Sequence, residues 1–189
     1  KLILDGLEDL ARQGDWRFRM VFVGDGSDFE EIRSYAGTLA ISDRCLFAGA
    51  ERDRETLRAY YSMADLFLLP SYFDNRPIVV LEAAACGLPS LLLRGSSAAE
   101  IITDGQNGLL MEATPQSLAR AAAQVLKEPE LSRKLGQNAM DQLYLSWEDA
   151  VAAAWRRYLE VLDNYRRKQE ERRLYRRVLR AHLPLRHRK

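Results

Sequence analysis

Short apolar runs alternate with amphipathic segments along the chain. The apolar runs, which fit strands buried on both faces of a parallel sheet, lie at 20–23, 45–48, 66–69, 91–93 and 109–111. Between and around them, apolar residues recur at helical spacing over 2–10, 29–39, 53–63, 79–86, 116–126 and 130–143. Strands that alternate with helices in units of about 20–25 residues predict a doubly wound, Rossmann-like α/β fold with a mostly parallel sheet.

The ends of several helices carry capping signals. Ser27, with Glu30 three residues later, predicts a capping box for the second helix. Gly87 predicts a left-handed residue at the end of the helix over 79–86. Residues 146–149 resemble a capping box, and helical composition then continues without Gly or Pro to about residue 180. We expect a long C-terminal helix with a break at Asp163–Asn164, where the sequence changes from apolar-faced to basic.

Charge follows the same division. Residues 165–189 carry eleven Lys and Arg against two Glu, an excess of +9, whereas the rest of the chain holds 17 basic and 25 acidic residues. We therefore divide the chain into a folded domain over 1–164 and a basic C-terminal helix or tail over 165–189. Such asymmetry indicates an anionic partner for the tail, or an acidic surface elsewhere on the same protein.

Composition narrows the class of protein. With 189 residues, 47% hydrophobic and 29% charged, the chain is a globular domain and not a disordered, collagen-like or disulfide-rich one. No apolar run approaches the ~20 residues that a membrane helix needs, and no signal-peptide pattern is present. Cys45 and Cys86 lie in apolar stretches and are interpreted as buried thiols of a reduced, cytoplasmic compartment. Lys1 lies inside a helix-like pattern, so we take the chain to be a piece of a longer protein.

Candidate chemistry lies in the loops that follow the strands, because ligands bind at the carboxyl ends of strands in open α/β sheets. The loop over 70–78 is the most informative, since it leads from a strand into a helix. Asp74 lies in this loop, and Glu82 lies about one turn into the helix, where its carboxylate can accept two vicinal sugar hydroxyls. The free first-turn amides and the helix dipole form a cradle for a diphosphate. The alternative is that Asp74 forms a turn and Glu82 is a solvated helix residue.

A family resemblance favours the first interpretation. Between about residues 23 and 161, the chain resembles the C-terminal domain of the family-4 glycosyltransferases, retaining enzymes of the GT-B architecture that use nucleotide-sugar donors. The matching motifs, in order, are VGDG at 23–26, FAG at 47–49, YSMADLFLLPS at 61–71, LEAAACGLP at 81–89, Glu100, DGQNGLL at 104–110, PEL at 129–131 and SW at 146–147. Each motif is weak alone, but their order and spacing together are specific.

The resemblance implies roles for the loop residues. Asp74 and Glu82 occupy the two positions of the family's E-x7-E motif, with Asp one methylene shorter than Glu. By resemblance, Asp74 is the catalytic candidate. Asn75, Arg76 and Pro77 would contact the transferred sugar or a phosphate.

The remaining donor contacts also follow from the resemblance. Glu82 would hold the ribose hydroxyls, and the amides of Ile78 and Val79 would hold the diphosphate. Gly24 joins the donor site, and the loop with Ala50 and Asp53 would face the nucleobase. Arg94 is interpreted as a solvated surface residue, with a phosphate contact as the alternative. His182 and His187 lack metal-ligand spacing, so we expect no metal and no cofactor.

The resemblance also indicates what lies upstream. In this family an Arg and a Lys neutralise the donor diphosphate near the start of the first helix, and Lys1 falls about three residues too late to be that Lys. We expect both basic residues, the first strand of a 3-2-1-4-5-6 sheet and an acceptor-binding N-terminal domain to precede this chain. The sheet would then have a slot in its middle, and the chain alone would be catalytically inactive.

The predicted function is the nucleotide-sugar-binding half of a retaining hexosyltransferase that uses a UDP- or GDP-sugar and a glycan or lipid acceptor, as in cell-envelope glycan synthesis. The alternatives are a non-catalytic GT-B-like binding domain and a sugar-nucleotide epimerase or phosphorylase of the same architecture. The basic helix over 165–189 can lie on an anionic membrane at the inner face, or remain solvated, or pack on the N-terminal domain. Nucleic acid is not expected as a partner, because the aromatic platforms that single strands need are lacking.

Overall fold

The computed structural model describes residues 1–73 and 78–182. The chain divides into two compact units, one over Lys1–Tyr144 and one that begins at Leu145. The boundary between the units therefore lies about twenty residues before the change in charge at residue 164. Each unit is described by itself below.

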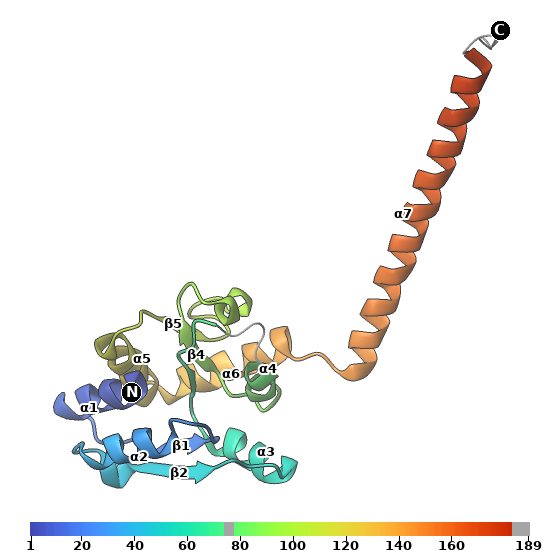
Figure 1. The fold of residues 1–189 in the computed structure, drawn as a ribbon. Coiled ribbons are helices and arrows are strands. Elements are labelled where there is room, and N and C mark those ends of the chain that lie inside the picture. Colours follow the sequence, from blue (N-terminus) through green and yellow to red (C-terminus); the bar gives the residue numbers. More distant parts are fainter. Residues whose placement is uncertain (74–77, 183–189) are drawn as a thin grey trace. The chain divides into compact units, whose positions relative to one another are not determined.

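The described residues of the first unit form five short strands, all paired in parallel. They are β1 (Met20–Val23), β2 (Cys45–Gly49), β3 (Phe67–Leu69), β4 (Ser90–Leu93) and β5 (Leu109–Met111). They form two separate sheets, β1–β2 and β3–β4–β5 (Figure 1). Met20 pairs with Cys45 in the first sheet, and Phe67 pairs with Ser90 in the second. The predicted doubly wound α/β class is confirmed.

Helices connect successive strands and cover the sheets. They are α1 (Leu2–Arg12), α2 (Phe29–Gly37), α3 (Arg54–Met63), α4 (Ile78–Ala85), α5 (Pro115–Lys127) and α6 (Pro129–Leu143), with short 3-10 turns at Ser42–Arg44 and Ser97–Ile101. Each lies within a few residues of the range that the apolar periodicity predicts. The sequence pattern therefore locates every helix of this unit in the described residues.

The core forms where α1 and α5 lie side by side against the second sheet (Figure 1). Gly6 allows this approach, since a Cβ on it would lie 2.7 Å from Cδ2 of Leu118. The largest buried side chains of this cluster are Leu4, Leu10, Ile41, Leu91, Leu93, Met111, Leu118 and Leu135. Burying one side chain of this size contributes about 1.5–3 kcal/mol. β4 is buried along its whole length, whereas β1 and β2 are half-buried or exposed.

A cavity of about 1000 Å³ lies where the two sheets face each other. Its lining includes all of β1 over 20–23 and all of β3 over 67–69, together with Leu7 and Leu10 of α1. β1 pairs only with β2, and β3 pairs only with β4, within the residues that the structure describes. The sequence predicts a slot in the middle of the sheet, and this cavity lies between the two sheets, where such a slot is expected.

Two of the predicted helix ends are confirmed and one is wrong. Gly87 follows α4 with a φ of 69°, in the left-handed region. Ser146 and Asp149 form the predicted cap, because the Asp149 amide donates to Oγ of Ser146 at 3.1 Å. The capping box at Ser27 and Glu30 does not form: Asp28 is the residue before α2, and the Ser27 hydroxyl donates to its carboxylate at 2.8 Å. The physical reason is a turn at Ser27 and Asp28, which delays the helix.

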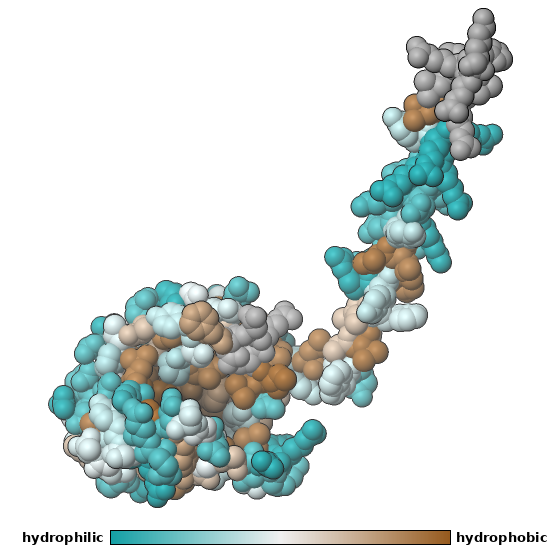
Figure 2. Space-filling view, viewed as in Figure 1, coloured by the Kyte–Doolittle hydropathy of each residue, from teal (hydrophilic) through white to brown (hydrophobic). Residues whose placement is uncertain are grey.

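The second unit is dominated by α7 (Trp147–His182), a continuous helix of 36 residues. The break that we expect at Asp163–Asn164 is absent. Neither residue prevents helix formation as Gly or Pro would, and both have a partner three residues on: Arg166 lies 3.8 Å from Asp163, and Arg167 donates to Asn164 at 2.8 Å. Apolar and charged side chains follow each other along its exposed surface (Figure 2).

Two further findings concern the two cysteines and the question of a membrane-spanning helix. Cys45 and Cys86 are free thiols and are half-buried, not buried as predicted. Cys45 begins β2, a strand that is itself only partly buried, and Cys86 lies in the turn after α4. Burial nonetheless raises the pKa of the Cys45 thiol. Among the described residues, no helix is long and apolar enough to cross a membrane.

Candidate donor-binding site

Among the predicted site residues, Glu82 has a carboxylate that is held in place by another helix. It lies on α4, which follows β3 after a loop, and its side chain is half-buried. The hydroxyl of Tyr61, in the last turn of α3, donates to Oε2 of Glu82 at 3.1 Å. The Glu82 carboxylate is therefore held by a residue from another helix and is not simply a solvated side chain.

The first turn of α4 provides the amides that the sequence assigns to a diphosphate. Ile78 begins the helix and is 70% exposed, whereas Val79 is half-buried. The first amides of a helix have no partner within it and carry the positive end of its dipole. The geometry of this turn therefore suits an anion. Asp74, Asn75, Arg76 and Pro77, also predicted in this site, lie outside the described residues.

Three predicted site residues belong to the lining of the cavity between the two sheets. Gly24 after β1, Ala50 after β2 and Val79 of α4 all line the cavity between the sheets. Gly24 has a φ of 145° and donates its amide to the carbonyl of Gly49 at 2.8 Å, which joins the loops after β1 and β2. These loops follow the carboxyl ends of parallel strands, the position where α/β folds bind ligands.

Asp53 has a clear structural role as the N-cap of α3. One of its oxygens, Oδ2, accepts both the amide and the hydroxyl of Thr56, each at 2.8 Å. These bonds lower the pKa of the Asp53 carboxyl below its ordinary value. The neighbouring Glu51 carboxylate accepts the amides of Arg52 and Asp53, each at 2.7 Å. The predicted nucleobase loop is thus shaped by its own acidic side chains.

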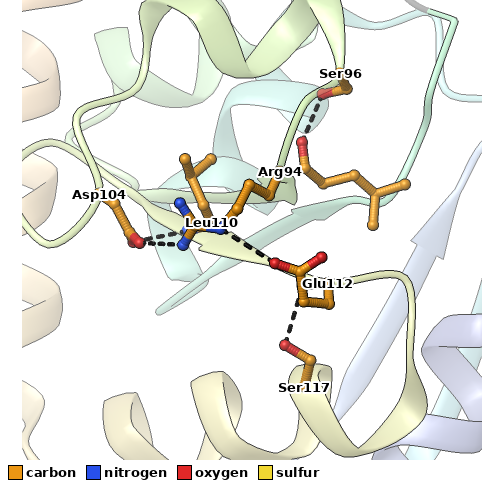
Figure 3. Close-up of polar contacts among 7 residues, drawn as sticks. Arg94, Ser96, Asp104, Leu110, Glu112 and Ser117 are labelled. Carbon is orange, nitrogen blue, oxygen red and sulfur yellow. Dashed lines mark hydrogen bonds and ion pairs between the residues drawn. The ribbon is translucent and has the colours of Figure 1, made fainter.

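Arg94 belongs to an ion-pair cluster between β4 and β5 (Figure 3). Its guanidinium lies 2.6 Å from Asp104 and 3.3 Å from Glu112. Asp104 also accepts the amide of Leu110 at 2.9 Å. Hydrogen bonding to Asp104 raises the pKa of Arg94. Because two carboxylates already compensate this charge, the cluster agrees with the surface role that we prefer for Arg94 over a phosphate contact.

Tyr61 is the residue that the sequence analysis missed as part of a site. Its helical spacing with Leu57 is typical of a core position, and it is indeed 9% exposed. The partner of its hydroxyl is 21 residues away, so periodicity gives no signal for the contact. Among the described residues, no group of three or more His, Cys, Asp or Glu is arranged to hold a metal ion.

Residues 1–142 match the family described as "Glycosyl transferases group 1". The match covers most of the chain, in which the fold and the candidate site lie. The chain therefore belongs to the group 1 glycosyltransferases.

One curated relative is similar to the chain in sequence, and two solved structures are similar to it in fold. The chain is 37% identical over 127 residues to the N-acetyl-alpha-D-glucosaminyl L-malate synthase of Bacillus anthracis, a match that covers 67% of this chain and 32% of that protein. Its fold is similar to the sucrose-phosphate synthase of Thermosynechococcus elongatus, with a TM-score of 0.71, 24% identity and coverage of 85% and 42% of the two chains. Anabaena Alr3699/HepE, solved in complex with UDP, gives a TM-score of 0.69 at 21% identity and coverage of 86% and 44%. The chain thus spans about a third of the curated relative and less than half of either solved chain.

Proposed function

We propose that this chain is the donor-binding half of a retaining glycosyltransferase that moves a hexose from a UDP- or GDP-sugar to a hydroxyl of a glycan or lipid acceptor. The observation that carries the proposal is the Glu82 carboxylate, held at 3.1 Å by Tyr61 one turn after the open amides of α4. A carboxylate and a helix N-terminus at this spacing can bind the ribose and the diphosphate of one nucleotide. Membership of the group 1 glycosyltransferases and the UDP bound to the Anabaena neighbour support a nucleotide-sugar as the ligand.

In this proposal the chain's residues act by position and electrostatics. Glu82 accepts the ribose hydroxyls, while the amides of Ile78 and Val79 stabilise the charge that develops on the leaving diphosphate. Asp74, with Asn75, Arg76 and Pro77, contacts the transferred sugar. No metal and no cofactor take part, because helix amides and basic residues of the upstream segment neutralise the diphosphate.

The remaining donor contacts come from the loops after β1 and β2. Gly24 approaches the donor without a side chain, and Ala50 and Asp53 belong to the loop that faces the nucleobase. The acceptor binds to an N-terminal domain of the same protein, so we expect the 189-residue chain alone to be inactive. The whole protein would act in the cytoplasm, on acceptors that include cell-envelope glycans.

Calorimetric titration of UDP and GDP into the protein tests the proposal. One nucleotide should bind, and Glu82→Ala should weaken it by roughly 1–3 kcal/mol, the cost of losing hydrogen bonds to a charged group. Glu30→Ala is a matched control, since Glu30 is an exposed carboxylate of the same domain that belongs neither to the proposed site nor to a family motif. Equal affinity of wild type and Glu82→Ala in the full-length protein would contradict the proposed site.

The alternatives give different results in the full-length protein. A non-catalytic binding domain would show no sugar transfer and no slow hydrolysis of any UDP- or GDP-sugar. An epimerase would convert the sugar without releasing the nucleotide, and a phosphorylase would require inorganic phosphate. Release of UDP or GDP that depends on an acceptor hydroxyl identifies the glycosyltransferase.

We further propose that the basic C-terminal part of α7 contacts the inner face of an anionic membrane. At 100° per residue, one arc of the helix carries apolar side chains and the opposite arc carries arginines. The two sets are Leu174, Tyr175, Val178 and Leu179, and Arg172, Arg173, Arg176 and Arg177. All eight side chains are exposed. An apolar stripe with a basic face is typical of helices that lie in a lipid interface.

Co-sedimentation with vesicles tests this contact. The protein should bind vesicles that contain phosphatidylglycerol more tightly than pure phosphatidylcholine vesicles, and salt should weaken the binding. Arg176→Gln with Arg177→Gln should weaken it about 30-fold, since each basic residue contributes about 1 kcal/mol. The control is Arg156→Gln with Arg157→Gln, in the earlier part of the same helix. Binding that depends on neither pair nor on lipid charge would contradict the proposal.

A further inference from the structure

Tyr61 has a rigid environment. The residue is 9% exposed, and its ring makes an edge-to-face contact with Phe67 of β3, with the ring centroids 5.8 Å apart. Ala83 of α4 and Leu88, after α4, belong to the same apolar cluster. The phenol is therefore fixed by groups from a strand, a helix and the segment that follows the helix.

The fixed phenol points to one partner. Its hydroxyl donates to Oε2 of Glu82 at 3.1 Å, and among the residues that the structure describes no second hydrogen bond to this carboxylate is present. Burial and the nearby Glu82 charge raise the pKa of Tyr61 well above its usual value. The hydroxyl therefore keeps its proton at every physiological pH and remains a donor.

We propose that Tyr61 is a positioning residue for nucleotide binding, which orients the Glu82 carboxylate before the ligand arrives. This inference rests on the proposed function, in which Glu82 accepts the vicinal hydroxyls of a ribose. A Glu side chain has three rotatable bonds, and Tyr61 restrains the last of them by holding Oε2. Oε1 then stays available to one hydroxyl, and the second lone pair of Oε2 to the other.

The size of the effect follows from pre-organisation. Without the Tyr61 hydroxyl, Glu82 would lose its rotational freedom only on binding, and immobilising one such side chain corresponds to a weakening of about three- to tenfold. Tyr61→Phe keeps the ring and its packing against Phe67, so it removes the hydrogen bond alone. We expect the loss to concern the ribose hydroxyls and not the base or the diphosphate.

A double-mutant cycle in the full-length protein tests the inference. The affinities for UDP and GDP are measured for wild type, Tyr61→Phe, Glu82→Ala and the double variant. For the nucleotide that binds, affinity for its 2′-deoxy analogue is measured as well. Tyr60→Phe is the matched control, since the adjacent Tyr60 is half-buried and makes no hydrogen bond within the described residues.

The expected result has three parts. Tyr61→Phe weakens the nucleotide about three- to tenfold, whereas Tyr60→Phe leaves it unchanged. Tyr61→Phe also reduces the preference for the ribonucleotide over its 2′-deoxy analogue. Once Glu82 is Ala, Tyr61→Phe has no further effect, because the group that it positions is gone.

Other results would distinguish a failure of the positioning role of Tyr61 from a failure of the proposed donor site at Glu82. If Glu82→Ala weakens binding but Tyr61→Phe does not, or if Tyr61→Phe costs the same with and without Glu82, the positioning role is refuted and the donor site stands. If Glu82→Ala leaves the affinity for both nucleotides unchanged, the proposed donor site itself is refuted. A melting temperature measured for each variant shows whether a loss of binding reflects unfolding.

Discussion

Gly136 of α6 is a position where replacement by alanine should lower the free energy of unfolding. A Cβ added there would lie 1.8 Å from the carbonyl oxygen of Gly87 and 2.7 Å from its carbonyl carbon. To restore a separation of 3.0 Å, the oxygen or the helix must move by at least 1.2 Å. The obstacle is backbone, so no side-chain rotation relieves it. The turn at Gly87 ends α4, the helix that carries Glu82, so the displacement also reaches the candidate site.

The magnitude combines two opposing terms. Overpacking a close contact costs up to about 3 kcal/mol, and replacing a mid-helix Gly by Ala gains about 1 kcal/mol. We expect Gly136→Ala to lower the free energy of unfolding by about 2 kcal/mol, measured by urea denaturation of the full-length protein. Gly37→Ala, at the last residue of α2 where a Cβ meets nothing within 4 Å, is the control and should be neutral or slightly stabilising. A Gly136→Ala protein as stable as wild type would refute the packing argument.

Three further predictions concern caps and the slot. The Thr56 amide and hydroxyl lower the folded pKa of Asp53. The contribution of Asp53 to stability is therefore present above the unfolded pKa of about 3.9 and is lost as pH falls through the lower folded pKa. Asp53→Asn should flatten this part of the curve of melting temperature against pH. Thr114 accepts the Ser117 amide at 3.2 Å as N-cap of α5, so Thr114→Ala should cost about 1 kcal/mol in urea denaturation, whereas Thr114→Ser should cost less. Adding the upstream residues of the longer protein that we expect should raise the melting temperature of the chain, because the expected strand would then fill the slot. An unchanged melting temperature would contradict that account of the slot.

The sequence predicts the elements of the first unit well because each strand is a short, wholly apolar run between turns. Leu91 to Leu93, for example, has no alternative burial pattern, and the structure buries all three. The exact helix starts are harder. Ser27 and Glu30 satisfy the spacing of a capping box, but the competing bond between Ser27 and Asp28 decides the turn.

The site is less accessible to sequence reasoning because its contacts are long-range. Glu82 is recognisable from its spacing to Asp74 and from the family resemblance, but its partner Tyr61 comes from the preceding helix. A tyrosine at a core-like helical position gives no sign that its hydroxyl has a charged acceptor. The continuity of α7 through Asp163 and Asn164 is similarly decided by local partners, Arg166 and Arg167, that composition does not weigh.

The arrangement of the strands also has a kinetic consequence. Every pairing is parallel, so paired strands are separated in sequence by a helical connection. The segment that contains α2 connects β1 to β2, and the segment that contains α4 connects β3 to β4. Pairings between such distant segments form slowly, and unpaired strand edges stay exposed while they do. Since no hydrogen-bonded ladder joins β1 to β3 in the described chain, the two sheets can form in either order. We expect two independent folding nuclei, with the packing of α1 against α5 as the step that commits them to one domain.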